Sequence, residues 1–165
     1  MRAIVDLDKS KGELLLDGVE RQTMPAYEWR KLIALVPAET GWWGDIVGEH
    51  FEENYPLAEL LTSLSLSKDV LEWQVRRLSS GERQRLGFVR ALALKPKILL
   101  LDEPTAALDE KTTKQVESII KQQAKSGVGI IIITHDEKQA KRLADKSYLL
   151  ENGALKQLGG KKSNG

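Results

Sequence analysis

The sequence predicts an α/β fold in which a mostly parallel sheet is flanked by helices and carries a small α-helical subdomain. In the second half, apolar strand segments alternate with helical segments, an order typical of βαβ units and a parallel sheet. The segments Ile98 to Leu101 and Gly129 to Thr134 are apolar, as strands buried on both faces of a sheet are. Between the two strand-bearing halves, four leucines recur at helix spacing and indicate a helical block: Leu57, Leu60, Leu61 and Leu64.

Composition narrows the class of protein. The chain has 165 residues, of which 41% are hydrophobic and 30% charged, so it is the size of one domain and can fill a core. A net charge of +1 argues against a nucleic-acid partner. The absence of cysteine excludes disulfides, thiolate metal sites and cysteine nucleophiles. No apolar run approaches the ~18 residues of a spanning helix and no secretory signal is visible, so we expect a cytosolic domain.

The first half is expected to alternate short strands and helices. We predict a short strand at Leu14 to Leu16 that ends in the Asp17-Gly18 turn, and a second strand at Leu32 to Val36 that Pro37 ends. A helical turn is expected between them, at Pro25 to Arg30. The predicted helical block contains three segments: Asp45 to Asn54, Leu57 to Leu66 and Asp69 to Trp73.

In the second half, Ser80 is predicted to cap a helix that runs to about Leu94, and Asp109 to cap the next. The last predicted elements are a helix at Glu137 to Ala144 and a strand at Tyr148 to Leu150 that ends at Asn152-Gly153. Residues 159–165 are rich in Gly, Lys and Ser, and we expect a disordered tail there.

Polar residues follow the two most apolar strands, where ligands of parallel sheets bind. After the first strand come Asp102 and Glu103. Asp102 is a candidate for holding Mg²⁺ through water, and Glu103 for orienting an attacking water. Read alone, this pair is equally a solvated acidic turn. His135 follows the second strand and is a candidate phosphate contact, or a satisfied surface histidine.

A third feature is the start of the helix predicted near Ser80. Ser80 and Gly81 would present free helix amides and the positive end of the helix dipole, which together form an anion site. Gly81 would allow a phosphate to approach the backbone closely. An ordinary capped helix is the alternative.

The order and spacing of these motifs resemble those of the ATP-binding cassette (ABC) ATPases, whose P-loop NTPase-like fold is therefore expected. Leu78 to Glu82 resembles the signature motif, with Ser80 where glycine is usual and Glu82 where glutamine is common. Ile98 to Glu103 resembles the Walker B strand with its catalytic glutamate. Ala106 to Asp109 resembles the D-loop, and His135 falls on the switch histidine. The resemblance implies that Glu103 and His135 are catalytic and that ATP contacts Ser79, Ser80, Gly81, Glu82 and Asp109.

The resemblance divides the chain into parts. It implies a partial ATPase domain over residues 1–158, with the Q-loop region and helical subdomain at about 39–80 and the Walker B, D-loop and switch-histidine part at about 81–158. The Walker A motif, G-x-x-x-x-G-K-[ST], is absent. Residues 1–4 resemble the helix that follows that loop. We therefore expect a chain that lacks the P-loop and the N-terminal strands and is inactive alone.

A second departure lies in the Q-loop. The family has glutamine where this chain has Ala38, followed by Glu39, a candidate metal ligand. Trp42 and Trp43 come next, in a region that meets the membrane partner in transporters. They either form an exposed anchor or pack against the helical block.

The resemblance implies the ATP-binding subunit of an ABC transporter, with ATP and Mg²⁺ as cofactors. Its expected partners are a second ABC cassette in a head-to-tail dimer and an integral membrane permease that holds it at the inner face of the plasma membrane. Two alternatives remain open. One is a non-hydrolysing subunit that donates its signature helix and D-loop to a complete cassette. The other is a soluble ABC ATPase of DNA repair or translation.

Overall fold

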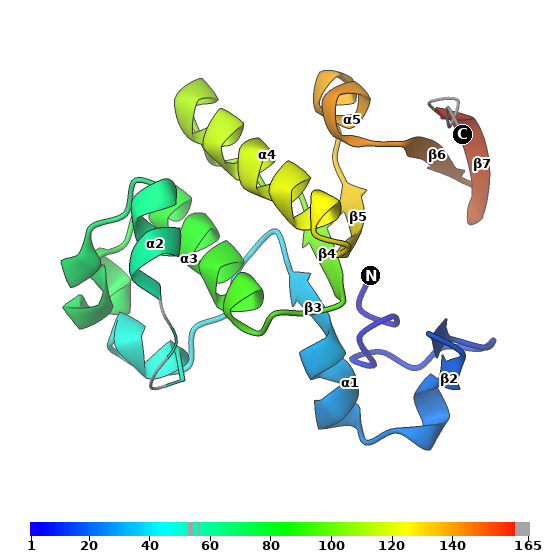
Figure 1. The fold of residues 1–165 in the computed structure, drawn as a ribbon, viewed down its shortest axis with the longest axis horizontal. Coiled ribbons are helices and arrows are strands. Elements are labelled where there is room, and N and C mark those ends of the chain that lie inside the picture. The colour runs from blue at the N-terminus through cyan, green and yellow to red at the C-terminus, as the bar shows by residue number, and fades with distance from the viewer. Residues whose placement is uncertain (53–54, 56, 161–165) are drawn as a thin grey trace. The chain divides into compact units, whose positions relative to one another are not determined.

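A computed structural model describes residues 1–52, 55 and 57–160 of the chain. The chain divides into two compact units, one from Met1 to Ile133 and a second that begins at Thr134. The first unit contains the parallel sheet, the helical block and the two longest helices, while the second contains a short helix and a hairpin (Figure 1).

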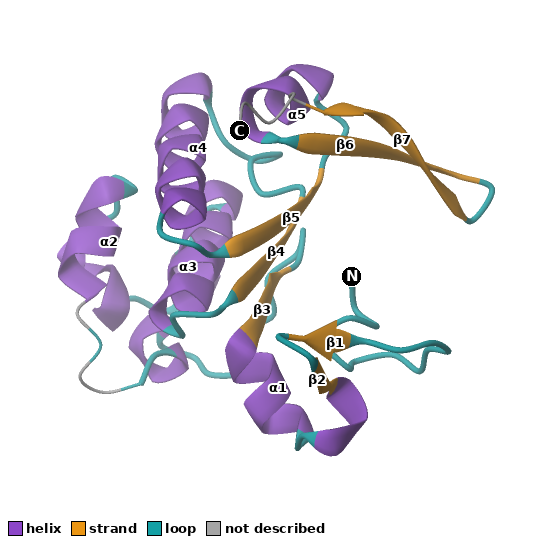
Figure 2. Cartoon of the chain, turned by 45° about the vertical axis from the view of Figure 1, so that its right-hand side comes forward, coloured by secondary structure: helices purple, strands orange, loops and turns teal. Residues whose placement is uncertain are grey.

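The centre of the first unit is a three-stranded parallel sheet with the order β3-β4-β5. Its strands are β3 (Ile33–Val36), β4 (Ile98–Asp102) and β5 (Gly129–Ile133), and β4 lies in the middle (Figure 2). Val36 is opposite Leu101, and Asp102 is opposite Ile133. The three consecutive leucines of β4 are fully buried, because elements cover both faces of this strand. The prediction of a parallel sheet is confirmed.

The N-terminal segment and α1 (Ala26–Leu32) cover one face of β3 and β4. Val5, Trp29, Ile33 and Leu100 form a buried apolar cluster there, and the Trp29 indole Nε1 donates a hydrogen bond of 2.8 Å to the carbonyl oxygen of Ile4. Residues 2–6 form turns rather than the helix that the resemblance implied, with a bond from the Ile4 amide to the Met1 carbonyl oxygen.

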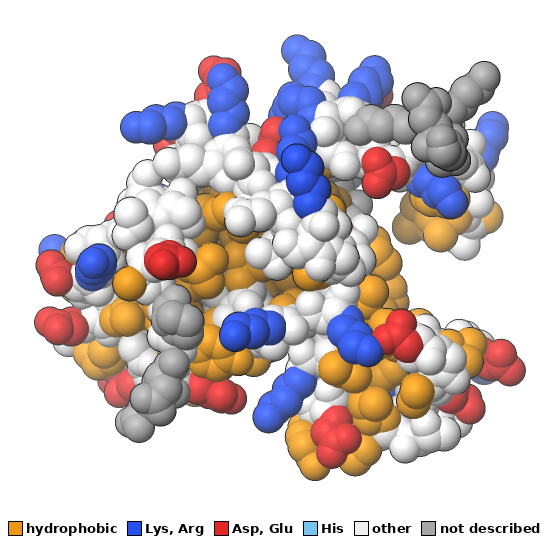
Figure 3. Space-filling model, viewed as in Figure 1, with side chains coloured by type: hydrophobic (Ala, Val, Ile, Leu, Met, Phe, Trp, Pro, Cys, Tyr) orange, Lys and Arg blue, Asp and Glu red, His pale blue; other side chains and the backbone are white. Residues whose placement is uncertain are grey.

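The predicted strand around Leu14 to Leu16 is part of a small hairpin. Its strands are β1 (Leu15–Leu16) and β2 (Val19–Glu20), joined by the expected Asp17-Gly18 turn. Both turn residues have positive φ, 51° and 79°, as the twist of a two-residue hairpin turn requires. A 3₁₀ turn, η1 (Arg21–Thr23), leads from this hairpin to α1. Figure 3 shows hydrophobic side chains at the surface of this region, where Leu15, Val19 and Tyr27 are exposed.

The prediction that β5 is buried on both faces is wrong. Ile131 and Ile133 are 46% and 42% exposed, whereas Ile130 and Ile132, which point to the opposite face, are partly covered. Among the described residues, β5 is the last strand of the sheet. The apolar cluster around Trp29 covers one face of the sheet at β3 and β4 but does not extend to β5.

The helical block consists of one short α-helix and three 3₁₀ turns. These are η2 (Val47–His50), α2 (Leu57–Ser63), η3 (Lys68–Glu72) and η4 (Val75–Arg77). The predicted helix from Asp45 is wrong beyond one turn, because Phe51 is already extended; the prediction's last two residues, 53 and 54, lie outside the described residues. The helix predicted to Leu66 ends at Ser63, since Ser65 is left-handed, with φ 54°.

Two long helices lie beside the sheet: α3 (Ser80–Ala93) and α4 (Glu110–Lys125). Asp109 caps α4 as predicted. The N-cap of α3 is Ser79 and not Ser80, because Ser79 has extended backbone and its hydroxyl accepts the Glu82 amide, while Ser80 is the first helical residue.

The second unit contains α5 (Glu137–Leu143), β6 (Lys146–Glu151) and β7 (Ala154–Gly160). The strands form an antiparallel hairpin around the predicted Asn152-Gly153 turn. Residues 159 and 160, predicted to belong to the disordered tail, are strand because they pair with Ser147 and Lys146; residues 161–165 lie outside the described residues. No helix in the described part of the chain is long and apolar enough to cross a membrane.

Candidate functional site

The acidic pair lies at the carboxyl end of the central strand. Asp102 is the last residue of β4, and Glu103 begins the turn that follows; both are half-buried. The Glu103 amide donates a 2.9 Å hydrogen bond to the carbonyl oxygen of Ile133, which continues the pairing with β5 by one residue. Glu103 has φ 48°, in the left-handed region that disfavours non-glycine residues. Sparsely populated backbone conformations of this kind cluster at functional sites.

The N-terminus of α3 has a complete capping box. The Ser79 hydroxyl accepts the Glu82 amide at 3.2 Å, and Glu82 Oε2 accepts both the Ser79 amide at 2.9 Å and the Ser79 hydroxyl at 2.7 Å. The hydrogen bond from the Ser79 hydroxyl is the main reason that the pKa of Glu82 is lowered. The Glu82 carboxylate is thus engaged in the cap, while Ser79 and Ser80 are exposed at the start of the helix.

The first turn of α3 packs on the segment that resembles a D-loop. A Cβ placed on Gly81 would lie 3.2 Å from the Ala107 carbonyl oxygen and 3.3 Å from Leu108 Cδ2. This segment continues into Asp109, whose carboxylate accepts the Thr112 amide and hydroxyl, both at 2.9 Å. The bond from the Thr112 amide is the main cause of the lowered pKa of Asp109. The signature-like segment, which ends at Glu82, and the D-loop-like segment, which begins at Ala106, are therefore adjacent in space.

Sequence reasoning missed Gln84, which joins the two regions. Its side chain is only 5% exposed, donates from Nε2 to the Glu103 carbonyl oxygen at 2.7 Å, and accepts the Ala107 amide at Oε1, 3.2 Å away. The available signal was a polar residue at helix spacing from Gly81, on the face of α3 that packs inward.

Arg85 fixes the same end of α3 to the helical block. Its Nη1 donates to the Leu64 carbonyl oxygen at 2.7 Å, where α2 has ended, and its Nε donates to the Gly81 carbonyl oxygen at 3.1 Å. Burial lowers the pKa of this guanidinium, which nevertheless stays charged at neutral pH.

Two further candidates are Glu39 and His135. Glu39 is exposed in the loop after β3, and His135 is exposed in the second unit, two residues after the end of β5. Within the described ranges, no three acidic or histidine side chains gather in a way that could hold a metal ion by themselves. Asp102 fits Mg²⁺, because a single carboxylate at a strand end suits an ion that keeps most of its water ligands.

Trp42 and Trp43 differ in how far they are buried. Trp42 is half-buried and makes an edge contact with His50, whereas Trp43 is 73% exposed. His50 holds this loop from inside, because its Nε2 accepts the amides of Trp43 and Gly44, both at 2.9 Å. Arg90 of α3 lies over both indole rings and donates to the Gly41 carbonyl oxygen at 3.1 Å.

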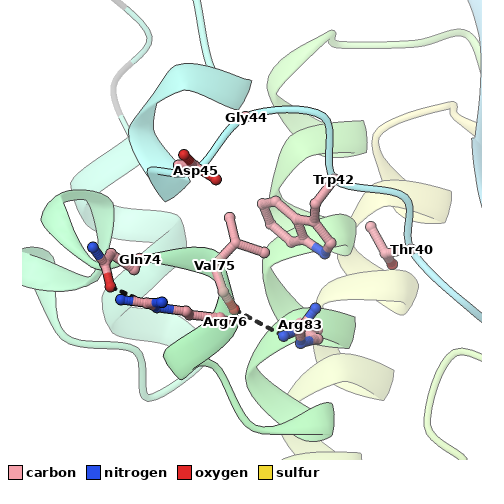
Figure 4. A pocket seen from close by; sticks show the side chains of 8 residues that line it. All are labelled: Thr40, Trp42, Gly44, Asp45, Gln74, Val75, Arg76 and Arg83. Carbon is pink, nitrogen blue, oxygen red and sulfur yellow. Dashed lines mark hydrogen bonds between the residues drawn. The ribbon is translucent and has the colours of Figure 1, made fainter.

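A cavity of about 530 Å³ opens between this loop and the helical block (Figure 4). Its lining includes Trp42, Asp45, Arg76 and Arg83, from the loop, from η4 and from α3. Arg83 is fixed by a 2.9 Å bond from Nη2 to the Val75 carbonyl oxygen. The Trp42 indole nitrogen is buried without a hydrogen-bond partner among the described residues.

A parallel sheet with an acidic pair at the end of its central strand, beside a capped helix N-terminus, is typical of α/β domains that bind phosphorylated ligands. Comparison with known protein families identifies the family. The family model described as "ABC transporter" matches residues 1–106, and the chain belongs to this family.

Curated relatives agree with this assignment. The chain is 44% identical over 97 residues to a phosphate import ATP-binding protein, PstB, of Mycoplasmoides gallisepticum, which covers 55% of the chain and 30% of the relative. It is 44% identical over 86 residues to the spermidine/putrescine import ATP-binding protein PotA of Spiroplasma citri, covering 52% and 25%. The chain thus spans about a third or less of the length of these relatives.

Solved structures match over nearly the whole chain. A dimeric ATP-binding cassette in a post-hydrolysis state with ADP and Pi superposes with a TM-score of 0.80 at 26% identity, covering 96% of this chain and 79% of the other. A bacterial Atm1-family ABC exporter with ATP bound superposes with a TM-score of 0.79 at 25% identity, covering 94% and 30%. The α/β prediction with a helical subdomain is confirmed by these likenesses.

Proposed function

We propose that this protein is the ATP-binding subunit of an ABC transporter, and that its cassette couples ATP binding and hydrolysis to solute transport. The observation that carries the proposal is the cluster in the first unit, where Glu103 at the end of β4, the segment to Asp109 and the capped start of α3 are packed together. Relatives named as import subunits favour import as the direction of transport.

Each residue of the cluster has a role that follows from its position. Asp102 binds Mg²⁺ through its water ligands, and Glu103 accepts a proton from the water that attacks the terminal phosphate. Mg²⁺-ATP supplies the phosphoryl group and neutralises charge that develops on it. We assign His135 a contact with that phosphate because it matches the switch histidine of the family. The α3 amides at Ser80 and Gly81 have no acceptor inside the helix and suit a phosphate oxygen.

The site uses two cassettes. These 165 residues contain no G-x-x-x-x-G-K-[ST] motif, the loop that grips the β- and γ-phosphates in such sites. We infer that two cassettes associate head to tail, so that the start of α3 in one contacts a nucleotide held by the other. The solved dimeric cassette with ADP and Pi supports this arrangement.

The loop with Trp42 and Trp43 is the surface we assign to a membrane-embedded permease, which would hold the subunit at the inner face of the membrane. Trp43 offers an exposed aromatic anchor, and Arg90 keeps it in place. The neighbouring cavity (Figure 4) has a volume sufficient for one or two side chains of a partner helix.

The test is ATP turnover by the full-length protein assembled with its partner subunits. Glu103→Gln is expected to lower kcat by about 10²–10⁴, the usual contribution of a general base, while ATP-dependent association of the cassettes persists. Glu59→Gln, which removes an exposed carboxylate of α2, is the matched control and is expected to leave turnover unchanged. Undiminished turnover in Glu103→Gln would remove Glu103 from its role.

A second function is favoured by one observation: the signature-like helix start is fully formed in a chain without the Walker A sequence. In this alternative, the subunit donates α3 and the D-loop-like segment to a complete cassette and hydrolyses nothing itself. Turnover of the assembly would then depend on Gly81 but not on Glu103. The two substitutions measured side by side decide between the functions.

A further inference from the structure

Gln84 connects the turn that carries Glu103 to the helix that carries the signature-like motif. Its side-chain amide is buried at 5% exposure on α3. Nε2 donates to the Glu103 carbonyl oxygen at 2.7 Å, and Oε1 accepts the Ala107 amide at 3.2 Å. One side chain thus holds both ends of the turn 103–107: the amide nitrogen donates at Glu103, and the amide oxygen accepts at Ala107.

The turn that Gln84 holds has an unfavourable backbone conformation. Glu103 has φ 48°, which side-chain-bearing residues seldom adopt, so surrounding contacts must maintain it. The bond from the Glu103 amide to Ile133 fixes one side of the residue, and the Gln84 amide fixes its carbonyl on the other. Because backbone conformation determines where the side chain leaves the chain, Gln84 helps to set the direction of the Glu103 carboxylate.

The same amide lies one helical turn after Gly81, on the same side of α3. The backbone of Gly81 packs against the carbonyl oxygen of Ala107, the residue whose amide Gln84 binds. A shift of the turn 103–107 must therefore move the start of α3 or break the Gln84 contacts. In the head-to-tail arrangement proposed above, Glu103 and the start of α3 serve two different nucleotides.

We propose that Gln84 is a positioning residue that orients Glu103 at one nucleotide and couples that orientation to the placement of the start of α3 at the other. The coupling role rests on the proposed function, whereas the clamp itself does not. A neutral amide of this length provides the required donor and acceptor together, whereas leucine provides neither and an ionised carboxylate provides no donor.

The clamp is tested without nucleotide, by amide hydrogen exchange of the full-length protein. Gln84→Leu is expected to speed exchange of the Ala107 amide about tenfold, the effect of losing one hydrogen bond, and the matched substitution Gln122→Leu on the exposed side of α4 is expected to leave it unchanged. Unchanged exchange at Ala107 in Gln84→Leu would overturn the clamp.

Gln84→Glu separates hydrogen bonding from packing. A protonated carboxyl is nearly isosteric with the amide and can donate to the Glu103 carbonyl oxygen while accepting from Ala107, but the ionised form can only accept. The Ala107 amide keeps an acceptor in both forms, whereas the Glu103 carbonyl oxygen loses its donor when the carboxyl ionises. Relative to wild type at each pH, protection of the Glu103 amide, which is bonded to the Ile133 carbonyl oxygen, is therefore expected to recover at acid pH and to fall as the pH rises. A merely structural role for residue 84 predicts no such pH dependence, and its absence would contradict the proposal.

The positioning role is tested by steady-state ATP hydrolysis of the assembled protein. Gln84→Leu is expected to lower kcat about tenfold with little change in KM, because it misorients Glu103 and leaves the phosphate-binding groups in place. An unchanged kcat in Gln84→Leu would overturn the positioning role. Absence of turnover in the wild type would overturn the proposed function and the coupling with it, while the exchange measurement would still decide the clamp.

Discussion

Replacement of Gly87 by alanine tests how closely α3 approaches the loop after β3. A Cβ on Gly87 would lie 2.4 Å from Thr40 Oγ1, 2.8 Å from Thr40 Cγ2 and 3.2 Å from Thr40 Cβ. Rotation about the Thr40 Cα–Cβ bond cannot relieve all three contacts, because Cβ does not move. Its two heavy substituents occupy two of three staggered positions, so at least one of the two clashing positions always stays filled. Gly87 is also buried in the middle of a 14-residue helix, so the backbone cannot shift without disturbing the helix.

Two opposing terms set the magnitude. Overpacking of a closely packed site costs about 1–3 kcal/mol. Replacing glycine by alanine inside a helix returns about 1 kcal/mol. The net change expected for Gly87→Ala is therefore a destabilisation of up to about 2 kcal/mol. In a Thr40→Ala background only the contact with Cβ at 3.2 Å remains, so the same substitution is expected to stabilise the protein.

The assay is a double-mutant cycle measured by urea unfolding. Unfolding is followed by tryptophan fluorescence, because Trp42 lies close to Thr40 in the chain. Thr40→Ala is a suitable second mutation because Thr40 Oγ1 is buried without a hydrogen-bond partner among the described residues, so its removal breaks no bond seen there. The expected coupling free energy is about 1–3 kcal/mol, with a reversed sign for Gly87→Ala in the Thr40→Ala background. Additive effects, within about 0.5 kcal/mol, would refute the packing argument.

Two further substitutions test the cap and the core. Ser79→Ala removes the hydroxyl from the α3 capping box and is expected to cost about 1 kcal/mol in urea unfolding at pH 7. Ser79 lowers the folded-state pKa of Glu82, so the stability that comes from its bond to the Glu82 carboxylate is present above the unfolded pKa of about 4.3 and is lost as the pH falls. If the difference in unfolding free energy between wild type and Ser79→Ala were the same at pH 3.5 and pH 7, this argument would be contradicted. Trp29→Phe leaves the Ile4 carbonyl oxygen without its 2.8 Å donor and removes buried volume. We expect the free energy of unfolding to fall by about 1–3 kcal/mol in chemical denaturation followed by circular dichroism. An unchanged midpoint would show that the Trp29 indole does not stabilise the fold.

Elements with strong local signals were predictable from the sequence. The three leucines of β4 and the apolar run of β5 are adjacent strands of a parallel sheet, and the Asp109 carboxylate caps α4 as its position before a helical pattern indicated. The hairpin turns at Asp17-Gly18 and Asn152-Gly153 were also found, because positive φ at such positions depends on residue type.

Elements set by tertiary contacts were not predictable. The segment from Asp45 forms one 3₁₀ turn because the His50 ring binds the amides of Trp43 and Gly44 and faces the carbonyls of Ile46 and Val47, which draws the chain around the side chain. Local periodicity carries no trace of such bonds. The choice between Ser79 and Ser80 as cap was within the one-residue uncertainty of any helix end.

The candidate site shows the same division. The places of Asp102, Glu103 and the start of α3 in the fold were predictable, because each belongs to a short motif next to a strand or at a helix end. Gln84 was missed, since its partners are 19 and 23 residues away and only the folded chain brings them to it. The functional roles of all these residues, and of His135 and Glu39, stay predictions.

Helix α3 explains how the separate features of the first unit act on one another. Along its length it contacts the Glu103 turn, the end of α2, the loop at Thr40 and the two tryptophans, through Gln84, Arg85, Gly87 and Arg90 respectively. A continuous helix of 14 residues is about 21 Å long and moves nearly as a rigid rod. A partner that displaces the exposed Trp43 therefore acts on the same body that holds Glu103. If the proposed function is correct, docking at one end of α3 and chemistry at the other are linked by packing alone, without a change of fold.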